Sequence, residues 1–148
     1  MPAFVTFGRI LFCVIFIFSG ASKLLDLTAT AQMTEKIVLP AALATYTSQL
    51  EGLTGLSMPM MLAIAAGAVE LICGFMIALN FGARFFAILL ILFVAAATFY
   101  YHDFWNQAGP EARNNMVHAL KNLSLIGALF MIVGYGRVSR AAEPAYDV

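Results

Sequence analysis

The chain has 148 residues, of which 62% are hydrophobic and only 11% are charged, and its formal net charge is +0. A soluble domain is about 45–50% apolar and about 25% charged, so this chain lacks the polar residues that a small water-facing domain needs. The composition therefore excludes a soluble enzyme, a disordered chain and, without a basic field for phosphates, a nucleic-acid-binding protein. It predicts a small integral membrane protein of one domain.

Four apolar stretches are each long enough to cross the bilayer core as a helix, which takes about 20 residues. Each contains at most one charged residue, and they cover residues 3–22, 57–80, 85–101 and 116–136. We expect an all-α, integral membrane four-helix bundle, with residues 138–148 as a short cytoplasmic tail. The connection at 24–56 is too polar to span and too apolar for a free linker. It predicts one or two short helices on the outer surface.

Four spans place both termini on one side of the membrane, and the positive-inside rule relates that side to the Lys and Arg count. The count is four against four: Arg9, Arg84, Arg137 and Arg140 on the terminal side, and Lys23, Lys36, Arg113 and Lys121 on the other. Three of the terminal-side arginines directly flank span ends in short segments. We therefore expect the termini in the cytoplasm.

Arg9 and Glu70 are charged residues inside predicted spans, where an ionisable group is costly and usually has a partner. Glu70 lies near the bilayer midplane, roughly 16 Å deep by helix rise, and Arg9 enters from the opposite end to about 10 Å. A long Arg side chain extends across such a gap. We expect an ion pair between Arg9 and Glu70, which either fixes the fold or serves as a proton relay or ligand anchor.

A second group of polar residues is predicted at the outer ends of the spans, all at one membrane level. One interpretation is an aromatic belt with polar interface residues. The other is a headgroup-level pocket for a lipid-soluble, carbonyl-bearing molecule such as a quinone, in which Asp103 would neutralise Lys121 or Lys23. The candidate ligand-binding residues are Ser19, Lys23, His102, Asp103, Trp105, His118, Lys121 and Asn122.

Other site types receive little support from the spacing of residues. His102, His118 and Asp103 follow no metal-ligand spacing, so no metal site is predicted. Cys13 and Cys73 are single thiols in apolar helices, without the C-x-x-C of thiol–disulfide catalysis. Glycines seven residues apart, at 67 and 74 and at 127 and 134, indicate close helix packing.

Four short motifs in order resemble the DoxX family of small four-span membrane proteins. They are Phe-Ser-Gly-Ala-Ser-Lys-Leu at 18–24, Gly-Ala-Val-Glu-Leu at 67–71, Phe-Tyr-Tyr-His-Asp-Phe-Trp-Asn at 99–106 and Lys-Asn-Leu-Ser-Leu-Ile-Gly at 121–127. The matching positions include Ser19, Gly20, Lys23, Glu70, His102, Trp105, Lys121 and Asn122. The resemblance implies a four-helix bundle in a bacterial-type inner membrane. Residues 110–115 belong to none of these motifs, and we expect a loop there.

The family takes its name from a subunit of a membrane thiosulfate:quinone oxidoreductase, which accompanies a second membrane subunit. The resemblance thus implies a redox-associated accessory subunit that binds a quinone, a membrane protein partner or a second copy of itself. Two alternatives stay open. One is a stand-alone quinone-dependent oxidoreductase, and the other is a small carrier that uses Glu70. Whether the chain is an enzyme is left open.

Overall fold

The computed structural model describes residues 3–135, and every regular element in that range is helical. Four helices are long and apolar enough to cross a membrane: α1 (Ala3–Leu25), α4 (Met58–Ala78), α5 (Ala83–Tyr101) and α6 (Gly109–Tyr135). The first connection holds α2 (Leu27–Thr34), the short turn η1 (Ala41–Leu43) and α3 (Ala44–Thr54), and the turn η2 (Phe104–Asn106) precedes α6. The expected all-α membrane fold with short helices in the first connection is confirmed. The predicted tail at 138–148 lies outside the described residues.

The start of α6 differs from the sequence-based expectation. The helix begins at Gly109, so the loop predicted at 110–115 is wrong. Gly109 has φ +69°, a left-handed conformation that lets the chain turn into the helix without strain. Pro110 then stands in the first turn, where a missing N–H costs nothing, and Glu111 suits the positive end of the helix dipole.

The four long helices form two antiparallel pairs. α1 packs on α4, α5 packs on α6, and α4 packs on α5 to join the pairs. The turn between α4 and α5 is tight because Asn80 and Gly82 both adopt left-handed conformations, with φ 59° and 56°. Near this turn all four long helices contribute to one core of Cys13, Phe16, Cys73, Ile77, Ala87, Leu90, Val94 and Leu129.

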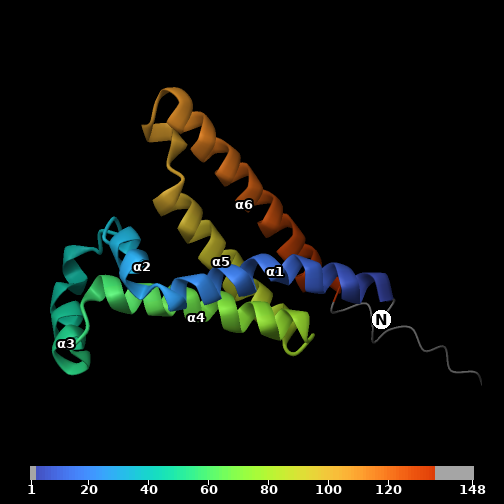
Figure 1. The fold of residues 1–148 in the computed structure, drawn as a ribbon, viewed down its shortest axis with the longest axis horizontal. Helices are drawn as coiled ribbons and strands as arrows, with labels where there is room; N and C mark the ends of the chain where they lie inside the picture. The colour runs from blue at the N-terminus through green and yellow to red at the C-terminus, as the bar shows by residue number, and fades with distance from the viewer. Residues whose placement is uncertain (1–2, 136–148) are drawn as a thin grey trace, which may run out of the picture.

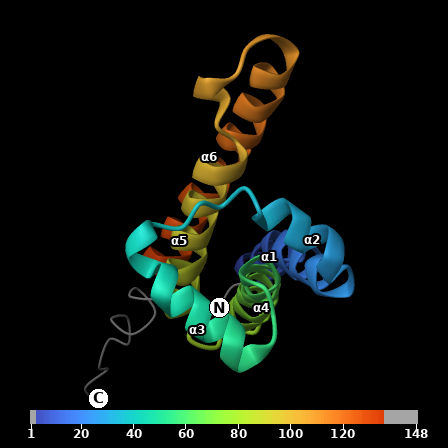
Figure 2. The ribbon, with the colours of Figure 1, turned by 90° about the vertical axis from the view of Figure 1, so that its left-hand side faces the viewer.

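Away from this core the two pairs diverge. In Figure 1 the α5–α6 pair leaves the α1–α4 pair at an angle, so that η2 and the α2 end of the molecule lie apart. Figure 2 shows the same separation with α1 and α4 seen end-on. Within residues 3–135, the backbones of α1 and α6 do not pack on each other. The space between the diverging pairs is where the candidate site lies.

Small residues let α1 and α4 approach closely. A Cβ atom at Gly20 would lie 2.6 Å from the backbone nitrogen of Leu71 and 2.7 Å from the carbonyl oxygen of Gly67. Gly74 likewise faces Ile17 of α1. The packing role predicted for the glycines of α4 is therefore confirmed. The other pair, at 127 and 134 on α6, has no neighbour within 4 Å of such a Cβ.

α2 folds back over one end of the α1–α4 pair. Asp26 begins this helix by accepting a hydrogen bond from the backbone N–H of Ala29 at 3.0 Å. The Thr30 hydroxyl donates to the Lys23 carbonyl at 3.1 Å, and the Thr34 hydroxyl donates to the Pro59 carbonyl at 2.7 Å. These contacts attach α2 to both helices of the pair, and it lies beside them in Figure 2.

Candidate functional site

A cavity of about 680 Å³ lies between the two helix pairs. Its volume falls within the roughly 300–1,000 Å³ that is usual for small-molecule sites. The wall is mostly apolar and comes from α1, α2, α4, α5 and α6, with Ile37 and Leu39 from the segment after α2. The polar and aromatic-hydroxyl side chains on the wall are Ser19, Lys23, Thr30, Thr34, Glu70, Tyr100, Tyr101, His102 and Asn122. A cavity of this kind suits an amphipathic, largely apolar molecule.

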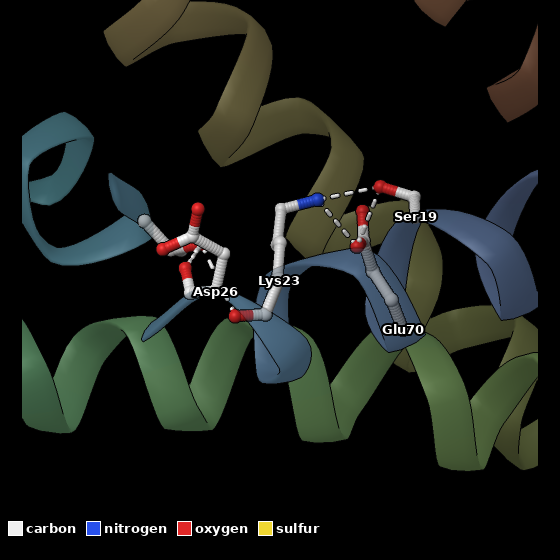
Figure 3. A network of polar contacts seen from close by, with 5 residues as sticks. Ser19, Lys23, Asp26 and Glu70 are labelled. Atoms are coloured by element: carbon white, nitrogen blue, oxygen red, sulfur yellow. Dashed lines mark hydrogen bonds and ion pairs between the residues drawn. The ribbon is translucent and has the colours of Figure 1, made fainter. Parts of the chain in front are cut away.

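One wall holds a compact polar triad of Ser19, Lys23 and Glu70 (Figure 3). The Lys23 ammonium donates to Glu70 Oε2 at 2.6 Å and to Ser19 Oγ at 2.5 Å, and Ser19 Oγ donates to the same Glu70 oxygen at 2.9 Å. The Glu70 side chain is 9% exposed and that of Lys23 is 30% exposed. An ammonium has three N–H groups, and two are used within the triad. The third is available to a ligand in the cavity.

The helix spacing explains why the triad forms. Ser19 and Lys23 are four residues apart and share one face of α1, and Glu70 follows Gly67 by one turn of α4. The contact of Gly20 with Gly67 and Leu71 brings these two faces together. Because the net charge of the ion pair is zero, the wall presents directed hydrogen-bonding groups without a net charge.

The structure replaces the predicted partner of Glu70. Its ion pair is with Lys23, so the expected pair with Arg9 is wrong. The reason is the register of two antiparallel helices. Gly20 lies on Gly67 and Ile17 lies on Gly74, so earlier residues of α1 lie beside later residues of α4. Arg9 is ten residues before Ser19, about 15 Å further along the helix.

The opposite wall contains His102, at the end of α5. Its Nδ1 lies 3.1 Å from Asn115 Oδ1. Asn115 Nδ2 donates to Gln107 Oε1 at 2.6 Å, and Gln107 Nε2 donates to Asp103 Oδ1 at 2.8 Å. The His118 ring stacks on His102 with centroids 5.0 Å apart and planes 10° from parallel. A chain of side chains from η2 and α6 thus holds this imidazole.

Gln107 and Asn115 are the residues that the sequence analysis missed at this wall. A signal was present for Asn115, since it lies three residues before His118 and seven before Asn122, on one face of a helix. The expectation of a loop at 110–115 hid that periodicity. Asp103 was expected to neutralise Lys121 or Lys23. It accepts a hydrogen bond from Gln107, and the ion pair of Lys23 is with Glu70.

The eight predicted ligand-binding residues divide into two groups. Ser19, Lys23, His102 and Asn122 line the cavity. Asn122 also donates to the Thr98 hydroxyl at 2.9 Å, which links α6 to α5. The other four lie outside the lining: Asp103 and His118 in the His102 network, Trp105 against Phe99 and Phe104, and Lys121 exposed on α6.

Within residues 3–135, no three His, Cys, Asp or Glu side chains gather in a way that suits a metal ion. Cys13 and Cys73 are free thiols and both are buried in the core near the α4–α5 turn. Their side chains pack with apolar neighbours and do not line the cavity.

Comparison with known proteins gives two matches. The DoxX family model matches residues 4–103, which contain the triad and His102. Inner membrane protein YphA of Escherichia coli (strain K12) is 30% identical over 140 residues, which are 93% of this chain and 88% of the relative. No solved structure matches the chain.

Proposed function

This chain belongs to the DoxX family, and we propose that it is an inner-membrane protein that binds a quinone-type molecule in the cavity between its helix pairs. The observation that carries the proposal is the mostly apolar cavity of about 680 Å³ with the Lys23 ammonium on its wall. An apolar ring and tail fit such a lining, while a few directed polar groups fix the orientation of the ring.

Lys23 is the residue that we assign to a ligand carbonyl. We assign its remaining N–H to the ligand, because Lys23 lines the cavity and Ser19 and Glu70 hold the ammonium in place. A hydrogen bond from a charged donor is stronger than one between neutral groups. Because Glu70 balances the charge of Lys23, a neutral ligand is favoured over an anion. A neutral molecule that carries carbonyls and dissolves in lipid meets both conditions.

The role that we favour is that of an accessory subunit. A bound quinone supplies two-electron redox chemistry, and the side chains around the cavity bind and orient it: hydroxyls, one ion pair, an imidazole and an amide. The electrons then come from or go to a membrane protein partner. A carrier remains the second candidate, because Glu70 lies near the middle of α4 and lines the cavity.

Native mass spectrometry after gentle extraction from the source membrane tests this proposal with two matched variants. Ala97 lines the cavity, and Ala95 on the same helix is exposed and outside the lining. We expect A97L to reduce the fraction of protein with a retained quinone about tenfold, since a bulky side chain there overlaps the ligand. The wild type and A95L retain the ligand, and all three retain the partner subunit.

Two results of this measurement contradict the proposal. Equal quinone retention by A97L and A95L would mean that the molecule binds outside the cavity. A wild type that carries only bulk phospholipid and no second subunit would favour the carrier, and Glu70-dependent flux into vesicles would then support that reading.

We also propose that both termini lie in the cytoplasm, which places α2, α3 and η2 on the outer side. Arg9 and Arg84 lie toward the terminal side of α1 and α5. A membrane-impermeant maleimide should label S48C in intact cells, because Ser48 is exposed on α3. It should label F81C, in the turn between α4 and α5, only after the membrane is opened. The reverse pattern would place the termini outside.

A further inference from the structure

The chain of hydrogen bonds that ends at His102 has a direction. It runs from Asp103 through Gln107 and Asn115 to the imidazole, with distances of 2.8, 2.6 and 3.1 Å. Every link lies between two side chains, and the links join the η2 region to α6 and back to the end of α5. Neither the family resemblance nor the ligand proposal assigns a role to Gln107 or Asn115.

The direction of these hydrogen bonds follows from the Asp103 carboxylate, where the series begins. An ionised carboxylate only accepts hydrogen bonds, so Gln107 must turn its NH₂ group toward Asp103 and its oxygen toward Asn115. Asn115 must then donate to that oxygen, and its own oxygen is turned toward His102. An oxygen acceptor at this position requires a proton on Nδ1. In neutral His102, Nε2 is therefore a hydrogen-bond acceptor.

We propose that Nε2 of His102 accepts a hydrogen bond from a hydroxyl group of the ligand in the cavity, and that Asn115 and Gln107 are positioning residues for this contact. His102 lines the cavity, its Nδ1 is bonded to Asn115, and the His118 ring covers one of its faces. The inference rests on the proposed function and deepens it. Lys23 donates at one wall, to a carbonyl or a hydroxyl oxygen, and His102 accepts at the other. A ring with a hydroxyl group facing His102, such as a quinol, is therefore bound more tightly than the fully oxidised quinone.

The tautomer of His102 tests the first half of this inference without any ligand. The chain contains only two histidines, so protein labelled with ¹⁵N-histidine in lipid gives two imidazole spectra, and H118Q identifies that of His102. We expect a protonated Nδ1 and an unprotonated Nε2. N115L should move the proton largely to Nε2, and N114L, at an exposed neighbouring position, should leave it on Nδ1. A wild-type His102 with its proton on Nε2 would overturn the inference.

The proposed hydrogen bond between His102 and a ligand hydroxyl is tested with trimethylhydroquinone and its dimethyl ether. Each probe is bound to the purified protein in lipid nanodiscs without oxygen. In the ether, methyl groups replace both hydroxyl hydrogens, so the change in the affinity ratio between the wild type and its variants reports the hydrogen bond to His102. We expect the wild type to favour the hydroquinone about fivefold over the ether, and H102F and N115L to remove this preference. N114L should keep it.

The outcomes separate this inference from the proposed function. If the wild type binds both probes equally while His102 carries its proton on Nδ1, the hydroxyl contact is refuted and the quinone cavity stands. If neither probe nor a short-chain quinone binds, the proposed function fails, and the ligand contact of His102 fails with it. A preference that survives in N115L would refute the positioning role of Asn115.

Discussion

Replacing Lys23 by methionine is expected to lower the free energy of unfolding by about 3 kcal/mol, because the change leaves the Glu70 carboxylate buried without its counter-ion. The Glu70 side chain is only 9% exposed, and two of its hydrogen bonds come from Lys23 and Ser19. Methionine has a similar length and keeps the apolar contacts of the lysine stem, so the loss is mainly electrostatic. The rate at which a thiol reagent labels Cys13 and Cys73 measures the unfolding, since both thiols are buried.

A second change tests whether the effect comes from the unpaired charge. Adding E70Q to K23M removes that charge, and we expect the double variant to recover most of the lost stability. K121M is the matched control, because Lys121 is exposed on α6 and substitutions at such positions stay within about 0.5 kcal/mol. If K23M labels no faster than K121M, the ion pair contributes little to the packing of α1 on α4.

The membrane spans were predictable because hydropathy and length decide them. Within residues 3–135 the four long apolar helices lie at the predicted stretches, with α4 at Met58–Ala78 inside the predicted 57–80. The first connection holds short helices, as its intermediate polarity indicated. The start of α6 was not predicted, since residues 110–115 are too polar to count as part of a span. A helix that extends beyond the apolar core has no hydropathy signal there, and only Gly109 and Pro110 mark its beginning.

The partner of Glu70 was not predictable from depth alone. Both Arg9 and Lys23 belong to α1, and a sequence gives their heights along one helix but not the register of that helix on its neighbour. The register is set by the contact of Gly20 with Gly67. Both glycines lie within the motifs described above, but the sequence does not show that these two glycines contact each other.

The cavity was predicted only in part for a related reason. Shared membrane level identified Ser19, Lys23, His102 and Asn122, which line it, together with four residues that do not. Lys121 and Asn122 are neighbours at the same level, but consecutive helical residues point about 100° apart, so one is exposed while the other faces the cavity. The divergence of the two helix pairs, which opens the cavity, leaves no periodic pattern in the sequence.

Alanine substitutions at glycines of α1, α4 and α6 should show that the contact of Gly20 with α4 determines how closely α1 packs on α4. We expect G20A to lower the free energy of unfolding by about 2–3 kcal/mol, because the new Cβ would meet the backbone of α4 at 2.6 and 2.7 Å, and backbone atoms cannot rotate away. G67A should cost less, since its nearest neighbour is the side chain of Leu24, which can change rotamer. Labelling of the two buried thiols measures both changes.

G127A provides the control, and it is expected to change stability in the opposite direction. A Cβ at Gly127 meets nothing within 4 Å, and alanine is a better helix former than glycine by up to about 1 kcal/mol. Equal effects of G20A and G127A would contradict the close contact of α1 with α4.

In G20A the two helices must separate, which lengthens the Ser19 and Lys23 bonds to Glu70, so we expect quinone retention to fall together with stability. In G67A the new Cβ would also lie 3.2 Å from the Gly20 carbonyl oxygen, so the backbones need to shift by only a few tenths of an ångström. Stability should therefore fall less than in G20A while the ligand is retained.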